Sequence, residues 1–469
     1  MKKYNTSIFI FRKDYRLYDN TALIAALKDS KSVIPIFIFT PQQIINNKYK
    51  SNNAIQFMIE SLTELNNELK QTTNSRLFYF FGEPSKILKQ ILTNIEVEAV
   101  FTNRDYTPYS KNRDEHIKNV CKNNKVDFVQ YEDSLLNNVG SVTNTSNQVY
   151  VKFTPYFNSA KKLKVRDPIK NNYRNYYPGR NKIKGEFTKD IHKFYDYNDK
   201  LSVNGGRGLA LKVLNSLPKF KTYNKDRNFL DKNTTHLSAY IKFGVVSIRE
   251  VYHKFKKILG NTNDLIKQLY WRDFYHNIME YHPNILSDDN KCFKPEYEKV
   301  PWTTYNDATI KEKEKWRKWC EGTTGFPIVD AAMRQLNTTG YMHNRGRMIV
   351  ASFLTKNMFW HFKEGEKYFA QHLVDYDPAN NNGGWQWCSS SGVDSMPYFR
   401  IFNPWLQSFK YDTDCEYIKK WVPELKDVPN KHIHKWYENY KEYDVYYEPM
   451  LDAKETAEKA IMTFKKHLK

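Results

Sequence analysis

The chain has 469 residues, with 73 Lys and Arg against 52 Asp and Glu, so its formal net charge is +21 at pH 7. Aromatic residues make up 16% of the chain, enough apolar surface to build cores, which excludes wholesale disorder. At about 100–200 residues per domain, the length predicts two or three domains. The positive excess favours a polyanionic partner such as nucleic acid, an anionic membrane surface or an acidic protein. A codon bias toward lysine and asparagine is the alternative explanation.

The cysteines and the hydropathy pattern narrow the class of protein further. The five cysteines are far apart and include no C-x-x-C pair. We interpret them as reduced thiols, exclude a four-cysteine zinc or iron–sulfur centre, and predict no metal site. No apolar run approaches the roughly 20 residues of a transmembrane helix, and the N-terminus lacks a signal-peptide core. We expect a soluble intracellular protein and leave open whether it works in the cytoplasm or the nucleus.

The first 130 residues alternate short apolar runs with amphipathic stretches. The apolar runs are 7–11, 33–39, 77–81, 99–102 and 126–130, and the helical stretches are 20–27, 54–70, 85–92 and 111–121. This alternation predicts a doubly wound, five-stranded parallel sheet. The glycine fingerprint G-x-G-x-x-G does not follow the first run, which argues against a nicotinamide dinucleotide site.

The remainder of the chain changes character twice. Residues 135–221 are rich in Asn, Ser, Lys and Tyr and predict a long connector over the surface. Helical periodicity then continues to the end. We therefore predict an α/β domain at 1–132, an interdomain linker at 133–215 and an all-α domain at 216–469.

The densest group of polar and aromatic residues is 375–387, where Asp375 and Asp377 precede Asn381, a glycine pair, Trp385 and Trp387. Glycines let a flat ligand approach the backbone, amides and carboxylates supply hydrogen bonds, and indoles offer stacking faces. A capped turn followed by core tryptophans is the alternative.

Two further segments could bind anions. Arg345 and Arg347 lie two residues apart, so on a helix one can meet a buried carboxylate while the other faces solvent or phosphate. Residues 234–238 (T-T-H-L-S) place hydroxyls and backbone amides ahead of a helical pattern, which suits a phosphate. Two surface arginines and a plain helix N-cap are the respective alternatives.

A fourth segment could stack on a nucleic-acid base. Gln268, Trp271 and Arg272 have the i, i+3, i+4 spacing that puts them on one helix face. A polar, aromatic and cationic face of this kind suits base stacking, although core packing also explains it.

These segments, in this order, resemble the photolyase/cryptochrome family over essentially the whole chain. Residues 11–20 (F-R-K-D-Y-R-L-Y-D-N) resemble the family opening F-R-x-D-L-R-x-x-D-N. Residues 234–238, 271–274, 325–334, 381–387 and 398–404 also match. The resemblance is strongest to the class I cyclobutane pyrimidine dimer photolyases. It implies a light-dependent carbon–carbon lyase, a deoxyribodipyrimidine photo-lyase, that repairs DNA.

The resemblance implies a non-covalent FAD in the helical domain, reduced and anionic in the active state. Arg347 would pair with Asp375 near the flavin ring, and the amide of Asn381 would face flavin N5, which favours an anionic reduced flavin. The implied cofactor positions are Tyr223, Thr234, Thr235, His236, Leu237, Ser238, Gln268, Arg272, Arg347, Asp375, Tyr376, Asp377 and Asn381.

The implied substrate is UV-damaged DNA, with the dimer flipped out against Trp271 and Trp387. The catalytic positions are Gln268, Asn344, Met348 and Asn381, and the DNA-binding positions are Arg227, Trp271, Arg272, Asn344, Arg345, Trp387, Arg400 and Gln407. We expect a monomer with no obligate protein partner and no membrane association.

Three positions distinguish between lesions. The (6-4) photolyases have two working histidines where this chain has Asn344 and Met348, and a (6-4) lesion needs acid catalysis whereas a cyclobutane needs only an electron. Gln268 stands where dimer-splitting enzymes have glutamate, as in (6-4) enzymes, and we expect it to reduce the repair yield. A (6-4) photolyase, a cryptochrome-type photoreceptor and a DNA-binding module with a vestigial flavin remain alternatives. The absence of a tail beyond Lys469 argues against the photoreceptor.

The resemblance also implies a three-tryptophan relay that photoreduces the flavin. Trp385 occupies the proximal position, but the middle position is Phe362, which is far harder to oxidise than an indole. Trp360 would lie about 200° away from it on a helix and cannot be assumed to replace it. Trp302, with Trp316 behind it, is the distal candidate, and we predict slow or rerouted photoreduction.

The α/β domain of this family can hold an antenna chromophore. Residues 103–110 fit the region, but Ser110 replaces the glutamate of folate-binding members. A folate, a deazaflavin, a second flavin and no antenna at all therefore stay open.

Overall fold

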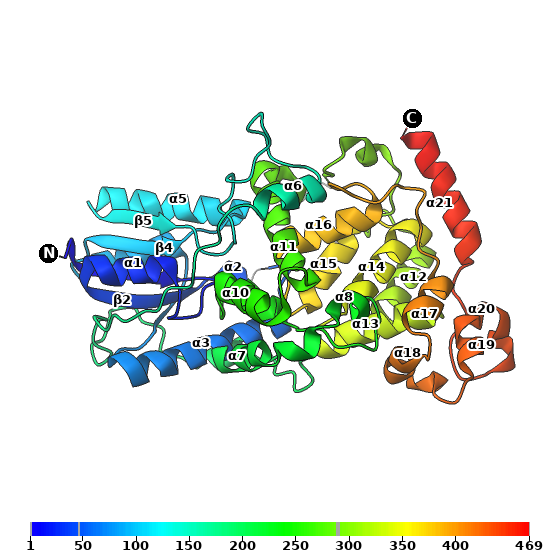
Figure 1. The fold of residues 1–469 in the computed structure, drawn as a ribbon, viewed down its shortest axis with the longest axis horizontal. Helices are drawn as coiled ribbons and strands as arrows, with labels where there is room; N and C mark the ends of the chain where they lie inside the picture. The colour runs from blue at the N-terminus through cyan, green and yellow to red at the C-terminus, as the bar shows by residue number, and fades with distance from the viewer. Residues whose placement is uncertain (1, 46, 288–290, 469) are drawn as a thin grey trace. The chain divides into compact units, whose positions relative to one another are not determined.

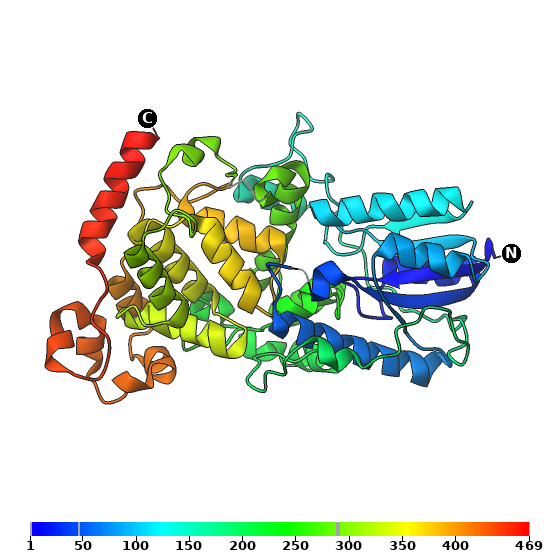
Figure 2. The same cartoon turned by 180° about the vertical axis from the view of Figure 1, so that it is seen from behind.

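The computed structural model describes residues 2–45, 47–287 and 291–468 (Figures 1 and 2). Contacts divide the chain into two compact units. We call the first the α/β unit (1–197, 203–221 and 235–283) and the second the helical unit (198–202, 222–234 and 284–469). The division at 132 and 215 stays a prediction about domains.

A five-stranded parallel sheet forms the centre of the α/β unit. Its strands are β1 (Tyr4–Phe11), β2 (Ser30–Phe39), β3 (Phe78–Phe81), β4 (Ala99–Asn103) and β5 (Asp127–Tyr131). They lie in the order β3-β2-β1-β4-β5, so each expected apolar run became a strand, and the doubly wound fold is confirmed. In register, Ile8 of β1 lies between Ile34 of β2 and Val100 of β4.

Amphipathic helices connect these strands, as predicted. They are α1 (Thr21–Asp29), α2 (Pro41–Ile44), α3 (Asn52–Thr73), α4 (Pro84–Leu92) and α5 (Pro108–Asn123). Ile87 and Leu88 of α4 and Ile117 of α5 join strand residues in one apolar cluster. Side-chain caps start these helices: Asn20 accepts the Leu23 N–H and Thr107 accepts the Ser110 N–H.

Part of the family opening serves the fold. Arg249 Nε donates to Asp19 Oδ2 at 2.8 Å and its Nη2 donates to Asp133 Oδ1 at 2.7 Å. Arg16 Nη2 donates to Asp133 Oδ2 at 2.6 Å. All four side chains are buried, and each charge meets an opposite one, as burial requires. Arg16 and Asp19 therefore join the sheet to α10 (Ile248–Leu259).

The connector is more regular than the sequence suggested. It includes α6 (Phe153–Ala160), η1 (Ile191–Phe194) and α7 (Arg207–Asn215), and η2 (Leu217–Phe220), α9 (Ser238–Lys242) and α11 (Asp264–Tyr281) complete the unit. The reason is aromatic packing. Phe153 and Phe157 of α6 contact Trp271 and Tyr270 of α11, respectively, and bury surface that an irregular loop would expose.

The helical unit has a large apolar core. Its longer elements are α12 (Ile310–Glu321), α13 (Pro327–Thr339), α14 (Asn344–Ser352), the π-helix η5 (Phe353–Asn357), α15 (Phe362–His372), α16 (Pro378–Ser389), α17 (Pro404–Tyr411) and α21 (Ala453–His467). Shorter ones are α8 (Tyr223–Asp226), η4 (Pro295–Lys299), α18 (Glu416–Trp421), η6 (Pro423–Leu425), α19 (Asn430–His434), α20 (Trp436–Asn439) and η7 (Tyr440–Glu442). Trp319, Phe362 and Trp385 all lie in this core. Among the described residues, no helix is long and apolar enough to span a membrane.

Candidate functional site

The expected ion pair between Arg347 and Asp375 is present. The Nη2 of Arg347 donates to both carboxylate oxygens of Asp375, at 3.1 and 2.9 Å, and its Nε donates to the Met342 carbonyl at 2.8 Å. α14 can begin at this place because the His343 ring caps it, accepting the Arg345 N–H at 3.1 Å. The pair therefore holds α14 to the segment just before α16.

The N-terminal half of α16 offers an amide beside open space. Asp377 caps the helix by accepting the Asn380 N–H at 3.0 Å. Asn381 donates from Nδ2 to the Glu366 carbonyl at 3.1 Å, which fixes its orientation. Gly384 lies one turn later on the same face, and a Cβ there would meet no heavy atom within 4 Å. This space admits a flat ring against the backbone, so these residues fit a flavin.

Trp385 follows Asn381 by four residues on α16, so the two side chains lie on neighbouring parts of the helix surface, and the Trp385 ring is buried in the core of the helical unit. Its indole is 2% exposed and meets Phe369 edge-on at 4.9 Å. Gly365 of α15 is required for this packing, because a Cβ at that position would collide with the Trp385 ring. Trp387 lies against the edge of the same core and is half-buried.

Several of the predicted DNA and lesion positions lie together in the helical unit. Asn344 is exposed on the first turn of α14, and its Nδ2 lies 3.6 Å from the Sδ of Met348. Arg345 Nη2 donates to Asn228 Oδ1 at 2.6 Å, and the guanidinium lies 4.2 Å from the Tyr411 ring centroid. Burial lowers the pKa of Arg345, and the neighbouring charge of Arg227 also lowers it.

Two further DNA-binding predictions fall on the segment around α17. Arg400 is exposed and precedes that helix, and Gln407 is half-buried within it. The Oε1 of Gln407 is buried without a hydrogen-bond partner. Its role stays a prediction, but it retains an unused acceptor, which is costly inside a protein.

α11 of the α/β unit contains the predicted stacking face. Trp271 lies parallel to Phe153 of α6, with ring centroids 3.5 Å apart and planes at 6°. Arg272 Nη1 donates to the Ser134 carbonyl at 2.6 Å, and Gln268 is half-buried one turn before Trp271. One face of Trp271 is thus covered by Phe153, a residue that sequence reasoning did not single out although its aromatic i, i+3, i+4 spacing was visible.

Asp273, the carboxylate within the same motif, has a structural role. It accepts the backbone N–H groups of Leu136 and Asn137 at 2.9 and 3.0 Å. Burial raises its pKa to about 6, against the lowering effect of Arg272 and these hydrogen bonds.

The predicted phosphate-binding segment, residues 234–238, crosses the boundary at which the two units divide the chain. Thr234 belongs to the helical unit, and residues 235–238 belong to the α/β unit. Thr234 Oγ1 lies 3.0 Å from the Tyr341 hydroxyl, both in the helical unit. His236 has a φ of 51°, and Ser238 begins α9. Tyr223 begins α8 and is half-buried. The prediction that Tyr223 and residues 234–238 bind the same flavin as Arg347 rests on the sequence alone.

Trp360 and Phe362, two positions considered for the electron relay, do not lie on one helix as the sequence analysis assumed. Phe362 is fully buried at the start of α15, and Trp360 precedes that helix, so an angle around a helix does not describe their relation. Trp302 stacks on Phe359 at 5.1 Å and meets His361 and Phe464 edge-on.

A buried carboxyl group behind Asn381 was missed by the sequence analysis. Glu366 Oε2 accepts a hydrogen bond from Asn382 Nδ2 at 3.1 Å, while its backbone carbonyl accepts from Asn381. Burial raises the pKa of Glu366 to about 7, which Lys363 and Asn382 only partly oppose. Nothing in its sequence context, a run of Lys and Glu, distinguishes it from a surface residue.

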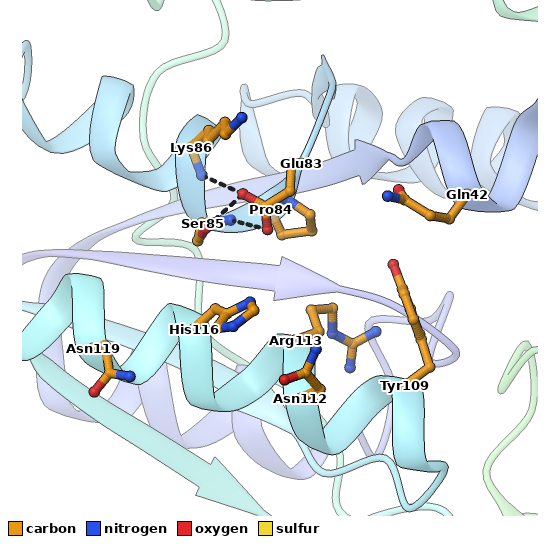
Figure 3. A pocket seen from close by; sticks show the side chains of 10 residues that line it. All are labelled: Gln42, Glu83, Pro84, Ser85, Lys86, Tyr109, Asn112, Arg113, His116 and Asn119. Atoms are coloured by element: carbon orange, nitrogen blue, oxygen red, sulfur yellow. Dashed lines mark hydrogen bonds between the residues drawn. The ribbon is translucent and has the colours of Figure 1, made fainter. Parts of the chain in front are cut away.

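The α/β unit also has a hollow between α4 and α5 with a volume of about 520 Å³ (Figure 3). It is lined by Gln42, Glu83, Pro84, Ser85, Lys86, Tyr109, Asn112, Arg113, His116 and Asn119. Glu83 accepts the N–H groups of Ser85 and Lys86, so the N-terminus of α4 is already capped. Of the predicted antenna region, Tyr109 lines the hollow, whereas Ser110 is buried and accepts from the Thr107 hydroxyl at 2.8 Å. These contacts do not distinguish between a folate, a deazaflavin, a second flavin and no antenna chromophore.

Comparisons with known proteins show which family the chain resembles along its length. Residues 7–172 match the family model described as DNA photolyase, and residues 265–466 match that of the FAD binding domain of DNA photolyase. A Buchnera aphidicola protein named deoxyribodipyrimidine photo-lyase is 32% identical over 98% of both chains. The crystal structure of the Sulfolobus tokodaii photolyase, which contains two FAD molecules, is 39% identical with a TM-score of 0.87, covering 98% of this chain and 100% of that one.

A class III photolyase from Agrobacterium tumefaciens has the same fold, with 28% identity and a TM-score of 0.88 over 100% of this chain and 98% of its own. The similarity therefore covers the sheet, the connector and the helices rather than a single motif. Both halves match photolyase models in the order that the motifs predicted. The chain belongs to the DNA photolyase family.

Proposed function

We propose that this protein is a light-dependent DNA repair enzyme that splits cyclobutane pyrimidine dimers with an electron from photoexcited reduced FAD. The observation that favours this lesion is the Asn344 and Met348 pair on α14, whose Nδ2 and Sδ atoms lie 3.6 Å apart. Neither side chain can give up a proton near neutral pH. A cyclobutane needs only an electron, so a neutral pair suffices for it and does not suffice for a (6-4) lesion.

The proposal assigns flavin binding to residues whose positions are compatible with it. Arg347 and Asp375 form a fixed ion pair, Asn381 presents a held amide, and Gly384 leaves open space for a ring. When bound and reduced, FAD supplies the photoexcited electron. The protein residues orient the ring and keep a neutral hydrogen-bonding group beside it. Asp377 and Tyr376 lie in the same segment, and their contact with the flavin is part of the proposal.

The proposal assigns DNA contacts first to Arg345 and Arg227 in the helical unit. The guanidinium of Arg345 is held by a hydrogen bond to Asn228 and by contact with the Tyr411 ring, and the charge of Arg227 lowers its pKa. A DNA phosphate beside the two guanidiniums would offset their mutual repulsion. Trp271 and Trp387 would stack on the flipped dimer, with Asn344 and Gln268 hydrogen-bonded to its bases.

We also infer a monomer inside the cell, without an obligate protein partner. All five cysteines are free, and four of them are buried. Size-exclusion chromatography with light scattering measures the oligomeric state, and a stable dimer would contradict this inference.

A second chromophore is known for the Sulfolobus tokodaii relative, whose structure contains two FAD molecules. Whether this chain binds one is decided by the absorption spectrum of the purified protein.

The decisive experiment is a repair assay on two oligonucleotides, one with a single cyclobutane thymine dimer and one with a (6-4) photoproduct. Protein reduced with dithionite should restore the first under blue light and leave the second unchanged, with no repair in the dark. Repair of the (6-4) lesion, or no repair of the dimer by flavin-loaded protein, would overturn the proposal. Arg345→Ala should weaken binding to the damaged duplex, and the exposed Lys426→Ala serves as the control for loss of one positive charge.

A further inference from the structure

We propose that this protein photoreduces its flavin through Trp319 and the stacked pair Trp316 and Trp360, instead of through position 362. The route begins at Trp385 and leads to the surface of the helical unit. It rests on the proposed function because it requires the flavin to lie next to Trp385. Nothing in the motifs assigns Trp319 a role.

Four indoles form a continuous series of ring contacts. Trp385 and Trp319 meet edge-on with centroids 6.3 Å apart, and Trp319 stacks on Trp316 at 5.3 Å with planes at 28°. Trp316 then stacks on Trp360 at 4.8 Å and 26°. Each step lies within the range of direct aromatic contact, about 4.5–7 Å between centroids. An electron can therefore pass between neighbouring rings without crossing aliphatic side chains.

Local structure fixes these rings in place. Trp316 and Trp319 are three residues apart on α12, which puts both on one helix face. Thr309 and Glu312 form a capping box that fixes the start of α12. The indole N–H of Trp319 donates to the Val350 carbonyl at 3.3 Å, and the Trp360 backbone N–H donates to the Leu354 carbonyl at 3.1 Å.

The route that the resemblance implies lacks such continuity. Phe362 stands at its middle position, and a phenyl ring is much harder to oxidise than an indole. Within the described chain, the ring neighbours of Trp302 are Phe359, His361 and Phe464, none of which belongs to the four-indole series. Trp319 can therefore donate an electron to oxidised Trp385 across a direct ring contact. The phenyl ring of Phe362 is too hard to oxidise to donate one.

The series also reaches solvent. Trp385 and Trp319 are buried, whereas Trp316 is half-buried. Trp360 is buried but lies 6.5 Å from the ring of Tyr305, which is 48% exposed. The positive charge left by the electron thus ends on the stacked pair, or on Tyr305 with loss of its phenolic proton to water. A small thiol in solution returns the electron there.

The electron count closes for each photon. Trp385 gives one electron to the photoexcited oxidised flavin, Trp319 gives one to Trp385, and Trp316 gives one to Trp319. The Trp316 and Trp360 pair is left one electron short until the thiol reduces it. No bond is made or broken while the charge stays on the indoles. Where it ends on Tyr305, the O–H proton goes to water and is regained when the thiol, the net reductant, returns the electron.

The test is transient absorption of the purified protein with oxidised FAD after a light flash. We expect Trp319→Phe to lower the yield of long-lived oxidised tryptophan by an order of magnitude or more. Trp436→Phe is the matched control, because Trp436 is equally buried and its indole N–H also donates to a backbone carbonyl, that of Tyr447 at 2.8 Å. If Trp302→Phe abolishes the signal and Trp319→Phe leaves it intact, the proposal is wrong.

Two further measurements separate the possible failures. If Trp319→Phe does not fold, Trp316→Phe, which is half-buried, should still shorten the lifetime of the oxidised tryptophan. In flavin-free protein, Trp316→Phe and Trp360→Phe should remove the same near-UV circular dichroism band if the two indoles are stacked. Protein reduced with dithionite bypasses the route. If protein reduced with dithionite does not repair the dimer, the proposed function is wrong. If the yield of long-lived oxidised tryptophan does not depend on Trp319, only the proposed route is wrong.

Discussion

Glu366 accepts a hydrogen bond from Asn382, with Oε2 and Nδ2 3.1 Å apart and both side chains buried. Burial raises the pKa of this carboxyl group to about 7, although Lys363 and Asn382 lower it. In the unfolded chain a glutamate titrates near 4.3. Between these two values the folded protein keeps a proton that the unfolded chain has lost. The stability therefore falls as the pH rises through this window, and the loss is complete above about pH 7.

We therefore expect Glu366→Gln to stabilise the protein at pH 8, by up to about 3 kcal/mol, and to change little at pH 4. The glutamine can still accept the Asn382 hydrogen bond but has no proton to lose. Thermal unfolding followed by circular dichroism at the two pH values measures the difference. Glu364→Gln on the same helix, where the carboxylate is partly exposed, controls for the loss of one acidic group. Equal stabilisation at both pH values would contradict the assignment.

The α/β unit shows the opposite pH dependence. Burial alone would raise the pKa of Asp133, but Arg16 and Arg249 hold it well below its usual range. The stabilisation from this carboxylate is present above its unfolded pKa, near 3.9, and is lost as the pH falls below it. Asp133→Asn leaves two buried guanidiniums short of a partner and should cost about 3–5 kcal/mol at pH 7.

Urea unfolding at pH 7 and pH 3 measures this effect, and we expect the cost to shrink at the lower pH. The control is Asp127→Asn, in which the carboxylate pairs with Lys3 at the surface and is 56% exposed. An exposed pair of this kind adds little stability. A cost for Asp133→Asn that is the same at both pH values would show that shape, rather than charge, holds the network together.

The ion pair at the proposed flavin position makes a binding prediction. Asp375 is 5% exposed and faces Arg347 at 2.9 Å, so Asp375→Asn leaves the guanidinium without its counter-charge and free to shift. We expect the affinity for FAD to fall about tenfold, which is about 1.4 kcal/mol. The flavin-to-protein absorbance ratio and a fluorescence titration of flavin-free protein measure it. Asp427→Asn, at an exposed carboxylate, should leave both unchanged.

The sheet could be predicted because its strands are encoded locally. Each apolar run is short, β-branched or aromatic, and followed by a helical stretch, and buried parallel strands need little else. The pairing of Arg347 with Asp375 came from the resemblance to the photolyase/cryptochrome family. The two-residue spacing from Arg345 indicated only that one of the two arginines could meet a buried carboxylate. The helix α6 within the connector was not predicted, because the residues that Phe153 and Phe157 pack against, Trp271 and Tyr270 on α11, lie far along the chain.

The electron-transfer geometry could not be read from the sequence. The spacing of Trp316 and Trp319 predicts a shared helix face, but not which face of α12 meets Trp385 of α16. That contact depends on Gly365, whose missing side chain leaves room for the Trp385 ring. Glu366 was invisible for the same reason, because its burial results from how α15 and α16 pack and not from its neighbours in the sequence.

Gln268 gives the last prediction, which concerns the repair yield. It is half-buried on α11, one turn before Trp271. The family resemblance implies a glutamate at this position in dimer-splitting enzymes. A neutral amide can hydrogen-bond a thymine carbonyl but stabilises developing charge less well than a carboxyl group does. Gln268→Glu should therefore raise the quantum yield of dimer repair when the enzyme is reduced with dithionite and saturated with substrate. The yield is measured per absorbed photon and normalised to bound flavin, so that a change in cofactor content does not enter. An unchanged or lower yield, with flavin content and DNA affinity preserved, would show that Gln268 already serves the reaction fully and that the substitution is compensated elsewhere in the pocket.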